Sequence, residues 1–367
     1  MKKNIDILFI SIIILSIIAV SIFWLVNKDA MHQDNINIIE PAKTQEVKED
    51  NTIKKIPENI VKQNSLTNFI FDIIADPHMD EQSDSEIFKQ TLNNIVQDNP
   101  SFVVDLGDTF MIDKLKDPSE ENIRARYVLI KEYYDLLGNI PLYFTVGNHE
   151  GEAGWDKINA RDYRLEYFPE QDYGKNYYSF EENNALFIIL DPFTYTMKKP
   201  KDDGWLWTLG KEQYEWLKET LELSNAEYKF VFIHHLVGSG SGDGRGGVEF
   251  ANLYEWGGNN VDGSYGFDSK RPGWGKPIHQ LLLENNVNAV FKGHDHFYAK
   301  QEMDGIIYLT LPQPSHPGNK VNTAEEYGYY EGEIIGGSGH IRVTVNDEVT
   351  IEFVRYEGNI VNKISIS

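Results

Sequence analysis

Short apolar runs, rich in β-branched and aromatic residues and separated by helix-like stretches, constrain the fold of this chain more than any other feature. From Phe69 onward the runs are FIFDII, FVVDL, PLYFTV, ALFIIL, KFVFI and NAVF. Helices are expected between them at about residues 84–97, 119–137, 211–223 and 277–284. This alternation predicts a layered α/β fold. The last runs, GIIYLTL, HIRVTV, VTIEFVRY and IVNKISI, predict antiparallel strands that complete a sheet.

Five of these strands end in side chains that bind metals or transfer protons. The side chains are Asp76, His78, Asp108, Asn148, His149, Glu150, His234, His294 and His296. Because α/β sheets place their sites at the carboxyl ends of strands, we expect these side chains to meet. Oxygen ligands mixed with imidazoles suit Mn, Fe or Zn. Seven candidate ligands are too many for one ion and fit two divalent ions that share a bridging carboxylate.

Composition excludes several other classes of site. The chain has no cysteine, which removes disulfides, thiolate metal sites and a cysteine nucleophile. Its net charge is -23, and because residues 1–65 hold eight basic and eight acidic residues, the excess lies in residues 66–367. So acidic a surface disfavours binding to nucleic acid or to anionic lipid. A phosphorylated substrate would then need positive charge from a metal site, since the side chains are not expected to supply it.

The N-terminus has the pattern of a membrane segment. Lys2 and Lys3 precede a mostly apolar run over residues 5–26, about the length of one membrane-spanning helix. We therefore predict a transmembrane signal anchor at 1–27, a polar tether at 28–65 and a globular domain at 66–367. A cleaved signal peptide is the alternative. In either case the globular domain lies outside the cytoplasm, as a single-pass protein of the cell membrane or as a secreted one.

The ordered motifs resemble those of the calcineurin-like metallophosphoesterase superfamily, which includes the purple acid phosphatases. The family pattern is D-x-H, G-D, G-N-H-(D/E), H and G-H-x-H, and it is complete here over about residues 69–300. The resemblance implies a four-layer α/β/β/α sandwich and a metal-bound hydroxide that attacks phosphorus. It also implies that Asp108 bridges two ions, one held with Asp76, His78 and His296, the other with Asn148, His234 and His294. His149 would then protonate the leaving oxygen or stabilise the transition state, with Glu150 fixing its orientation.

Two positions depart from the purple acid phosphatase pattern. Met111 stands where that branch has an iron-binding tyrosine, and His78 replaces a glycine. We therefore expect a general metallophosphoesterase, acting as an acid phosphatase-like phosphomonoesterase on a small phosphorylated substrate. The alternatives are a phosphodiesterase or nucleotide pyrophosphatase, and, from another class, a non-catalytic surface binding module stabilised by metal.

A glycine- and aromatic-rich segment at 236–276 follows the predicted ligand His234. Its run GSGSGDGRGG lacks the G-K-[ST] ending of a phosphate-binding loop. A loop of this length beside a site predicts a lid, with Arg245 as a phosphate partner. His235 would either contact substrate or pack in the core. Asp191, at the end of ALFIIL, is expected to be a structural turn residue.

Overall fold

The computed structural model describes residues 68–80, 83–156, 158–193, 203–238, 243–317 and 321–366. The predicted anchor and tether at 1–65 lie outside these residues. Within the described part of the chain, no helix combines the length and the apolar character needed to cross a membrane.

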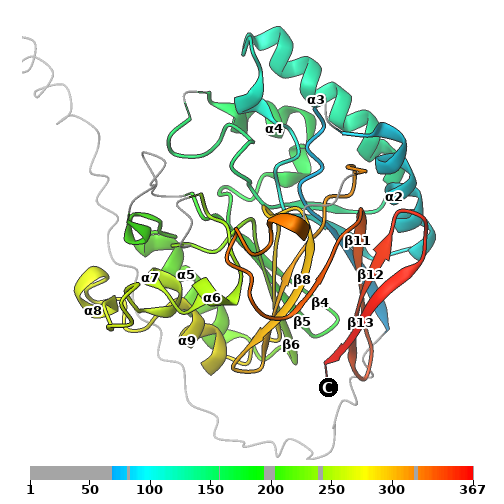
Figure 1. Cartoon of the computed structure of the whole chain (residues 1–367). Helices are drawn as coiled ribbons and strands as arrows, with labels where there is room; N and C mark the ends of the chain where they lie inside the picture. Colours follow the sequence, from blue (N-terminus) through cyan, green and yellow to red (C-terminus); the bar gives the residue numbers. More distant parts are fainter. Residues whose placement is uncertain are drawn as a thin grey trace, which may run out of the picture. The chain divides into compact units, whose positions relative to one another are not determined.

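The first of two sheets has six strands in the order β13-β12-β11-β1-β2-β3. Their bounds are β1 (Phe69–Ile74), β2 (Phe102–Asp105), β3 (Leu142–Phe144), β11 (Gly339–Val345), β12 (Val349–Arg355) and β13 (Ile360–Ile366). β1, β2 and β3 are parallel, and β11 to β13 are antiparallel and extend the sheet beside β1. The prediction that the tail strands complete a sheet is correct for these three, drawn in orange and red in Figure 1.

The second sheet has seven strands in the order β10-β8-β9-β7-β6-β5-β4. Their bounds are β4 (Tyr178–Glu182), β5 (Ala185–Leu190), β6 (Tyr228–Ile233), β7 (Ala289–Lys292), β8 (Tyr298–Met303), β9 (Ile306–Thr310) and β10 (Glu333–Ile335). The run GIIYLTL, predicted to be antiparallel, is β9 and pairs in parallel with β7. The sequence did not predict β8, which explains the difference. Because β8 and β9 form an antiparallel hairpin, the chain reverses once more before β9, and β9 therefore runs parallel to β7.

Helices cover the outer face of each sheet (Figure 1). α2 (Ser85–Asp98), α3 (Glu120–Tyr134) and α4 (Ala160–Tyr167) share a core with the first sheet, and α5 (Lys211–Leu223) and α9 (Ile278–Glu284) share one with the second. α2 begins after Asp84, whose side chain accepts hydrogen bonds from two backbone N–H groups of the first turn. Alternate residues of both sheets, such as Phe71 and Phe187, fill a third core between the sheets. The layers are therefore α/β/β/α.

The described part of the 236–276 segment folds into three short helices. These are α6 (Val248–Ala251), α7 (Tyr254–Gly257) and α8 (Phe267–Lys270). Trp256 of α7 is fully buried in the core on the helical face of the second sheet, and its indole N–H donates to the Tyr308 hydroxyl at 2.9 Å. Aromatic side chains therefore anchor this segment beside the sheet.

Candidate active site

The seven predicted metal ligands follow five strands from both sheets. Those after β1, β2 and β3 come from the first sheet, and those after β6 and β7 come from the second. The structure brings all seven together at the carboxyl ends of these strands. The site is thus assembled across the two sheets.

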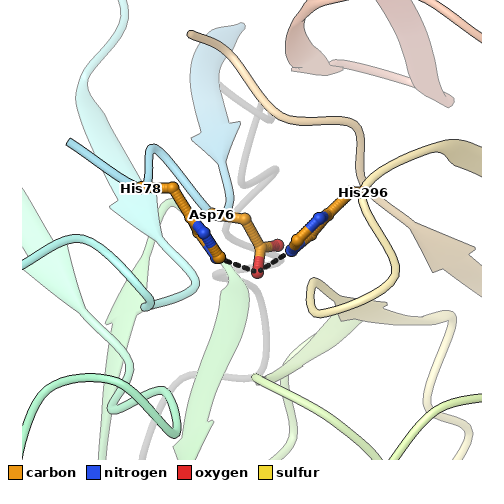
Figure 2. Close-up of side chains that lie close together, drawn as sticks. All are labelled: Asp76, His78 and His296. Atoms are coloured by element: carbon orange, nitrogen blue, oxygen red, sulfur yellow. Dashed lines mark ion pairs between the residues drawn. The ribbon is translucent and has the colours of Figure 1, made fainter. Parts of the chain in front are cut away.

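The first ligand cluster consists of Asp76, His78 and His296. Figure 2 shows the two imidazole rings on either side of the Asp76 carboxylate. The Nε2 atoms of His78 and His296 lie 3.7 and 3.4 Å from Asp76 Oδ1. Asp76 Oδ1 and His78 Nε2 are buried and have no hydrogen-bond partner among the described residues. Buried polar atoms normally have partners, so converging atoms without one fit a cation.

The second cluster consists of Asp108, His234 and His294, with Asn148 beside them. His234 Nε2 lies 3.3 Å from Asp108 Oδ2, 3.2 Å from Asn148 Oδ1 and 3.1 Å from His294 Nδ1. Asp108 Oδ2 is also 3.4 Å from His78 Nε2, and it has no hydrogen-bond partner among the described residues. One oxygen of Asp108 thus reaches both clusters, as a bridging carboxylate would.

Backbone strain is concentrated at these ligands. Five of the seven have a positive φ, between 43° and 75°: Asp76, His78, Asp108, His294 and His296. Such a conformation costs about 1–3 kcal/mol for a non-glycine residue and persists only where the surroundings impose it. Glycine also admits close contacts here, because a Cβ on Gly147 would lie 2.4 Å from Asp108 Oδ1 and one on Gly293 would lie 2.5 Å from Asp76 Oδ2. The strain and the glycines both serve to aim the ligands.

Hydrogen bonds to carbonyls fix the imidazoles of the second cluster. His234 Nδ1 donates to the Leu106 carbonyl at 2.8 Å, and His294 Nε2 donates to the Asp243 carbonyl at 2.7 Å. Because a carbonyl only accepts, the other nitrogen of each ring has a lone pair when the ring is neutral. His234 Nε2 then faces Asp108, and His294 Nδ1 faces His234 Nε2. Orientation of this kind is typical of metal-bound histidines.

The charge balance of the first cluster also suits a cation. Burial lowers the pKa of His78, but the nearby carboxylates of Asp108 and Asp76 outweigh burial and raise it to about 10. The same pairing lowers the pKa of Asp76 despite its burial. Without an ion, His78 therefore carries a proton at neutral pH, which a metal ion would displace.

His149 lies at the open side of the clusters and is oriented by a residue that the sequence did not indicate. Its Nε2 is 3.9 Å from Asp108 Oδ2, and its Nδ1 lies 2.9 and 3.0 Å from the two carboxylate oxygens of Asp113. The expectation that Glu150 orients His149 is wrong. Glu150 instead accepts backbone N–H bonds from Asp108 and Thr109 at 2.8 and 2.7 Å, which hold the loop after β2 in place.

Asp113→Asn is expected to lower kcat by about 10- to 100-fold, the usual effect of losing a carboxylate that orients a functional group. KM and metal content should stay close to those of the unmodified protein, because Asp113 belongs to neither cluster. Steady-state kinetics together with metal analysis checks this. A loss of bound metal, or an unchanged kcat, would contradict the positioning role.

His235 and Arg245 were both predicted to bind substrate, but their side chains contact other parts of the protein instead. His235 is fully buried, with its ring edge-on to Phe193 and Trp207, and burial lowers its pKa to about 3. Arg245 donates to the His294 carbonyl at 2.6 Å and lies over the Tyr327 ring. His235 therefore packs in the core, and Arg245 holds the loop that carries two ligands.

A cleft of about 610 Å³ opens onto the clusters. It is lined by His78, Asp80, Met111, Lys114, Leu115, Lys116, Asp117, Asn122, Arg126, His149 and His296. No described residue of 236–276 lines it, so the described part of the expected lid does not border this cleft. Three basic side chains do border it, which corrects the expectation that side chains supply no positive charge for a phosphate.

A two-sheet sandwich with converging metal-type ligands at its strand ends is the arrangement of a metal-binding site between two sheets. The sequence model of the calcineurin-like phosphoesterase family matches residues 70–298, more than half of the chain. The chain therefore belongs to this family and is a metallophosphoesterase, a hydrolase of phosphoric esters. The family uses dimetal centres, and the two clusters around Asp108 have the donor set for one.

Solved structures of similar fold include three from different organisms. A purple acid phosphatase from yellow lupin seeds has a TM-score of 0.56 at 14% identity, over 83% of this chain and 54% of that one. A dimetal phosphatase from Danio rerio has a TM-score of 0.53 at 12% identity, over 82% of this chain and 98% of that one. GAP50, the anchor in the inner membrane complex of Plasmodium, has a TM-score of 0.52 at 14% identity, over 82% of this chain and 89% of that one. At these identities the likeness shows the fold alone. Comparison with curated proteins gave no match.

Proposed function

We propose that this protein is a phosphomonoesterase that works with two divalent ions of Mn, Fe or Zn. The position of Asp108 carries the proposal. A single oxygen of this carboxylate lies 3.4 Å from His78 Nε2 in one cluster and 3.3 Å from His234 Nε2 in the other. A shared ligand atom between two sets of ligands is the arrangement that two-metal hydrolases need.

Each side chain then has a defined task. Asp76, His78 and His296 would hold one ion, Asn148, His234 and His294 the other, and Asp108 both. When bound, the ions would polarise the phosphate ester and activate water for attack. His149, held by Asp113, would donate a proton to the leaving oxygen from the open side of the site. Glu150 would keep Asp108 in place through the backbone.

The charges along the cleft favour a monoester over a diester. Lys114, Lys116 and Arg126 line the cleft together with the proposed acid His149. A phosphate monoester carries up to two negative charges near neutral pH, whereas a diester carries one, so nearby cations attract the monoester more strongly. The acidic Asp80 and Asp117 also line the cleft, and Lys114 Nζ lies 3.9 Å from Asp113 Oδ2, so carboxylates offset part of this positive charge.

The proposal is tested with the protein loaded with Mn²⁺ and two substrates that share a leaving group, an aryl phosphate monoester and the matching diester. We expect a higher kcat/KM for the monoester. A higher value for the diester would make the protein a phosphodiesterase. No turnover of either ester with ions still bound would favour a metal-stabilised binding module.

The double substitution Lys114→Ala/Lys116→Ala is expected to lower kcat/KM for the monoester about tenfold at low salt, since exposed charge pairs contribute up to ~1 kcal/mol each. The diester should lose less, and added salt should narrow the difference. Lys211→Ala/Lys218→Ala removes two exposed charges from α5 and serves as the matched control. Equal losses in the two double variants would show that the cleft lysines do not act on the substrate.

We further propose that residues 1–27 anchor the chain in the membrane and that 28–65 tether the enzyme outside the cytoplasm. Two lysines before the apolar run, and a polar segment at 28–65 with six basic and seven acidic residues, support this arrangement. Cleavage of the N-terminal segment would release the enzyme in secreted form.

A further inference from the structure

A buried charged network lies directly beside the last two ligands. Asp295 stands between His294 and His296 in the chain, but it belongs to neither ligand cluster. Asp295 is fully buried, and Lys292 and Tyr329, which bond to its carboxylate, are at most 3% exposed. The proposed chemistry uses none of these three side chains, so it does not account for the charges kept in the protein interior.

Four donors converge on the Asp295 carboxylate. Its Oδ2 accepts from Lys292 Nζ at 2.7 Å, from the Tyr329 hydroxyl at 2.5 Å and from the Gly246 N–H at 3.2 Å. Its Oδ1 lies 3.4 Å from Arg245 Nη1. Burial of a carboxylate is unfavourable unless it is paired and hydrogen-bonded, and about four hydrogen bonds satisfy it. Loss of one donor would therefore leave part of a buried charge uncompensated.

These donors come from three segments that are far apart in the chain. Lys292 is the last residue of β7, Tyr329 precedes β10, and Gly246 belongs to the glycine-rich run GSGSGDGRGG. Gly246 has a φ of 117°, and a Cβ there would lie 2.0 Å from the Phe250 ring. A larger residue could therefore not bring its N–H to Asp295 in this way. One carboxylate thus joins all three segments to the loop after β7.

The glycine-rich run also contacts the ligand His294 directly. The His294 carbonyl accepts from Arg245 Nη1 at 2.6 Å, and His294 Nε2 donates to the Asp243 carbonyl at 2.7 Å. His294 and His296 have φ values of 75° and 66°, a conformation that surrounding contacts must impose on a residue other than glycine. Asp295 lies between these two residues, and its four donors supply such contacts.

We propose that Asp295 and its donors form a positioning network that sets how tightly the second cluster binds its ion. This inference rests on the proposed dimetal function. Because His294 Nδ1 lies 3.1 Å from His234 Nε2, a shift of the loop would separate ligand atoms that now converge. Residues that hold a metal ligand in place typically contribute about 10- to 100-fold to metal affinity. The described part of the glycine-rich run would thus support His294 from behind, where the sequence predicted a lid.

Direct measurement of Mn²⁺ binding tests the network. Metal-free full-length protein is titrated with Mn²⁺, and the free ion is measured at each step. Tyr329→Phe removes one donor without removing a charge, and Asp295→Asn removes the charge of the carboxylate. We expect one of the two ions to bind about tenfold more weakly in Tyr329→Phe and about 100-fold more weakly in Asp295→Asn. Tyr308→Phe is the matched control and should bind both ions normally, because its hydroxyl is also buried and has two side-chain partners, as that of Tyr329 has.

Thermal unfolding of the metal-free proteins separates positioning from general stability. Both phenylalanine variants lose a buried hydroxyl and should lose similar stability, whereas only Tyr329→Phe should lose Mn²⁺ affinity. Unchanged affinity in Tyr329→Phe, or an equal loss in Tyr308→Phe, would overturn the proposal, and Tyr329→Phe decides the question alone if Asp295→Asn does not fold.

The position of the weakened ion gives a second measurement. In crystals of Tyr329→Phe at limiting Mn²⁺, anomalous scattering beside His294 should fall relative to that beside His78, and a fall beside His78 alone would contradict the proposal. If the unmodified protein binds no Mn²⁺, the proposed function fails as well. Two ions bound with equal affinity by all the proteins would refute the network only.

Discussion

Asp108→Asn is expected to lower kcat/KM for a phosphate monoester by about a thousandfold or more. Asp108 Oδ2 is the atom that reaches both ligand clusters, and the substitution removes its charge and weakens it as a ligand. Metal ions contribute several kcal/mol to transition-state stabilisation, and each 1.36 kcal/mol corresponds to a factor of about ten in rate. The variant should also bind less metal. Steady-state kinetics with metal analysis of the same sample measures both effects.

Asp191→Asn is the matched control for this substitution. Asp191 also follows a buried strand, β5, and its Oδ1 accepts the Phe193 backbone N–H at 2.7 Å, a hydrogen bond that an asparagine Oδ1 can also accept. Its turnover and metal content should remain near those of the unmodified protein. Comparable losses in the two variants would mean that Asp108 acts through general folding and not as a shared metal ligand.

His149→Ala is expected to lower turnover by about 10²- to 10⁴-fold, the range for a lost general acid. If His149 is the acid, metal content should be unchanged, because seven other side chains form the two clusters. A loss of metal would instead make His149 a ligand, since it also lies in a group with His78 and Asp108 that could hold an ion. The separation of turnover from metal binding distinguishes His149 from the ligands.

Added imidazole provides a further check on His149→Ala, since it can enter the cleft that the lost ring bordered. Partial recovery of turnover with imidazole would support proton transfer by His149. Full turnover in the variant without imidazole would remove His149 from the mechanism.

The sequence indicated which side chains would meet at the site, because each of them lies where a recognisable strand ends. Parallel strands deliver their carboxyl ends to one edge, so five short motifs far apart in the chain could be expected to meet. Asp113 could not be found in this way. It lies in a short 3₁₀ turn after β2, and only the fold places it beside His149 Nδ1.

His235 illustrates the limit of adjacency as an argument. Neighbouring residues of an extended segment point to opposite sides, so a residue next to a ligand need not face the same site. His234 points to Asp108, whereas the His235 ring packs against Phe193 and Trp207.

Net charge was similarly uninformative about the local potential. A chain of charge -23 still gathers Lys114, Lys116 and Arg126 at the cleft.

The hairpin of β8 and β9 did carry a signal, since Asp304 and Gly305 both have a positive φ and form the Asp-Gly turn typical of two-residue hairpins. The polar β8 sequence YAKQEM obscured it, because Lys, Gln and Glu are uncommon in strands.

The most direct test of the central claim is turnover of an aryl phosphate monoester by the full-length protein after chelation and after return of Mn²⁺. We predict no turnover in chelator and recovery when Mn²⁺ is restored, because the buried donors around Asp108 need cations to act on phosphate. Turnover that persists in chelator, with metal analysis showing no bound ion, would contradict the account.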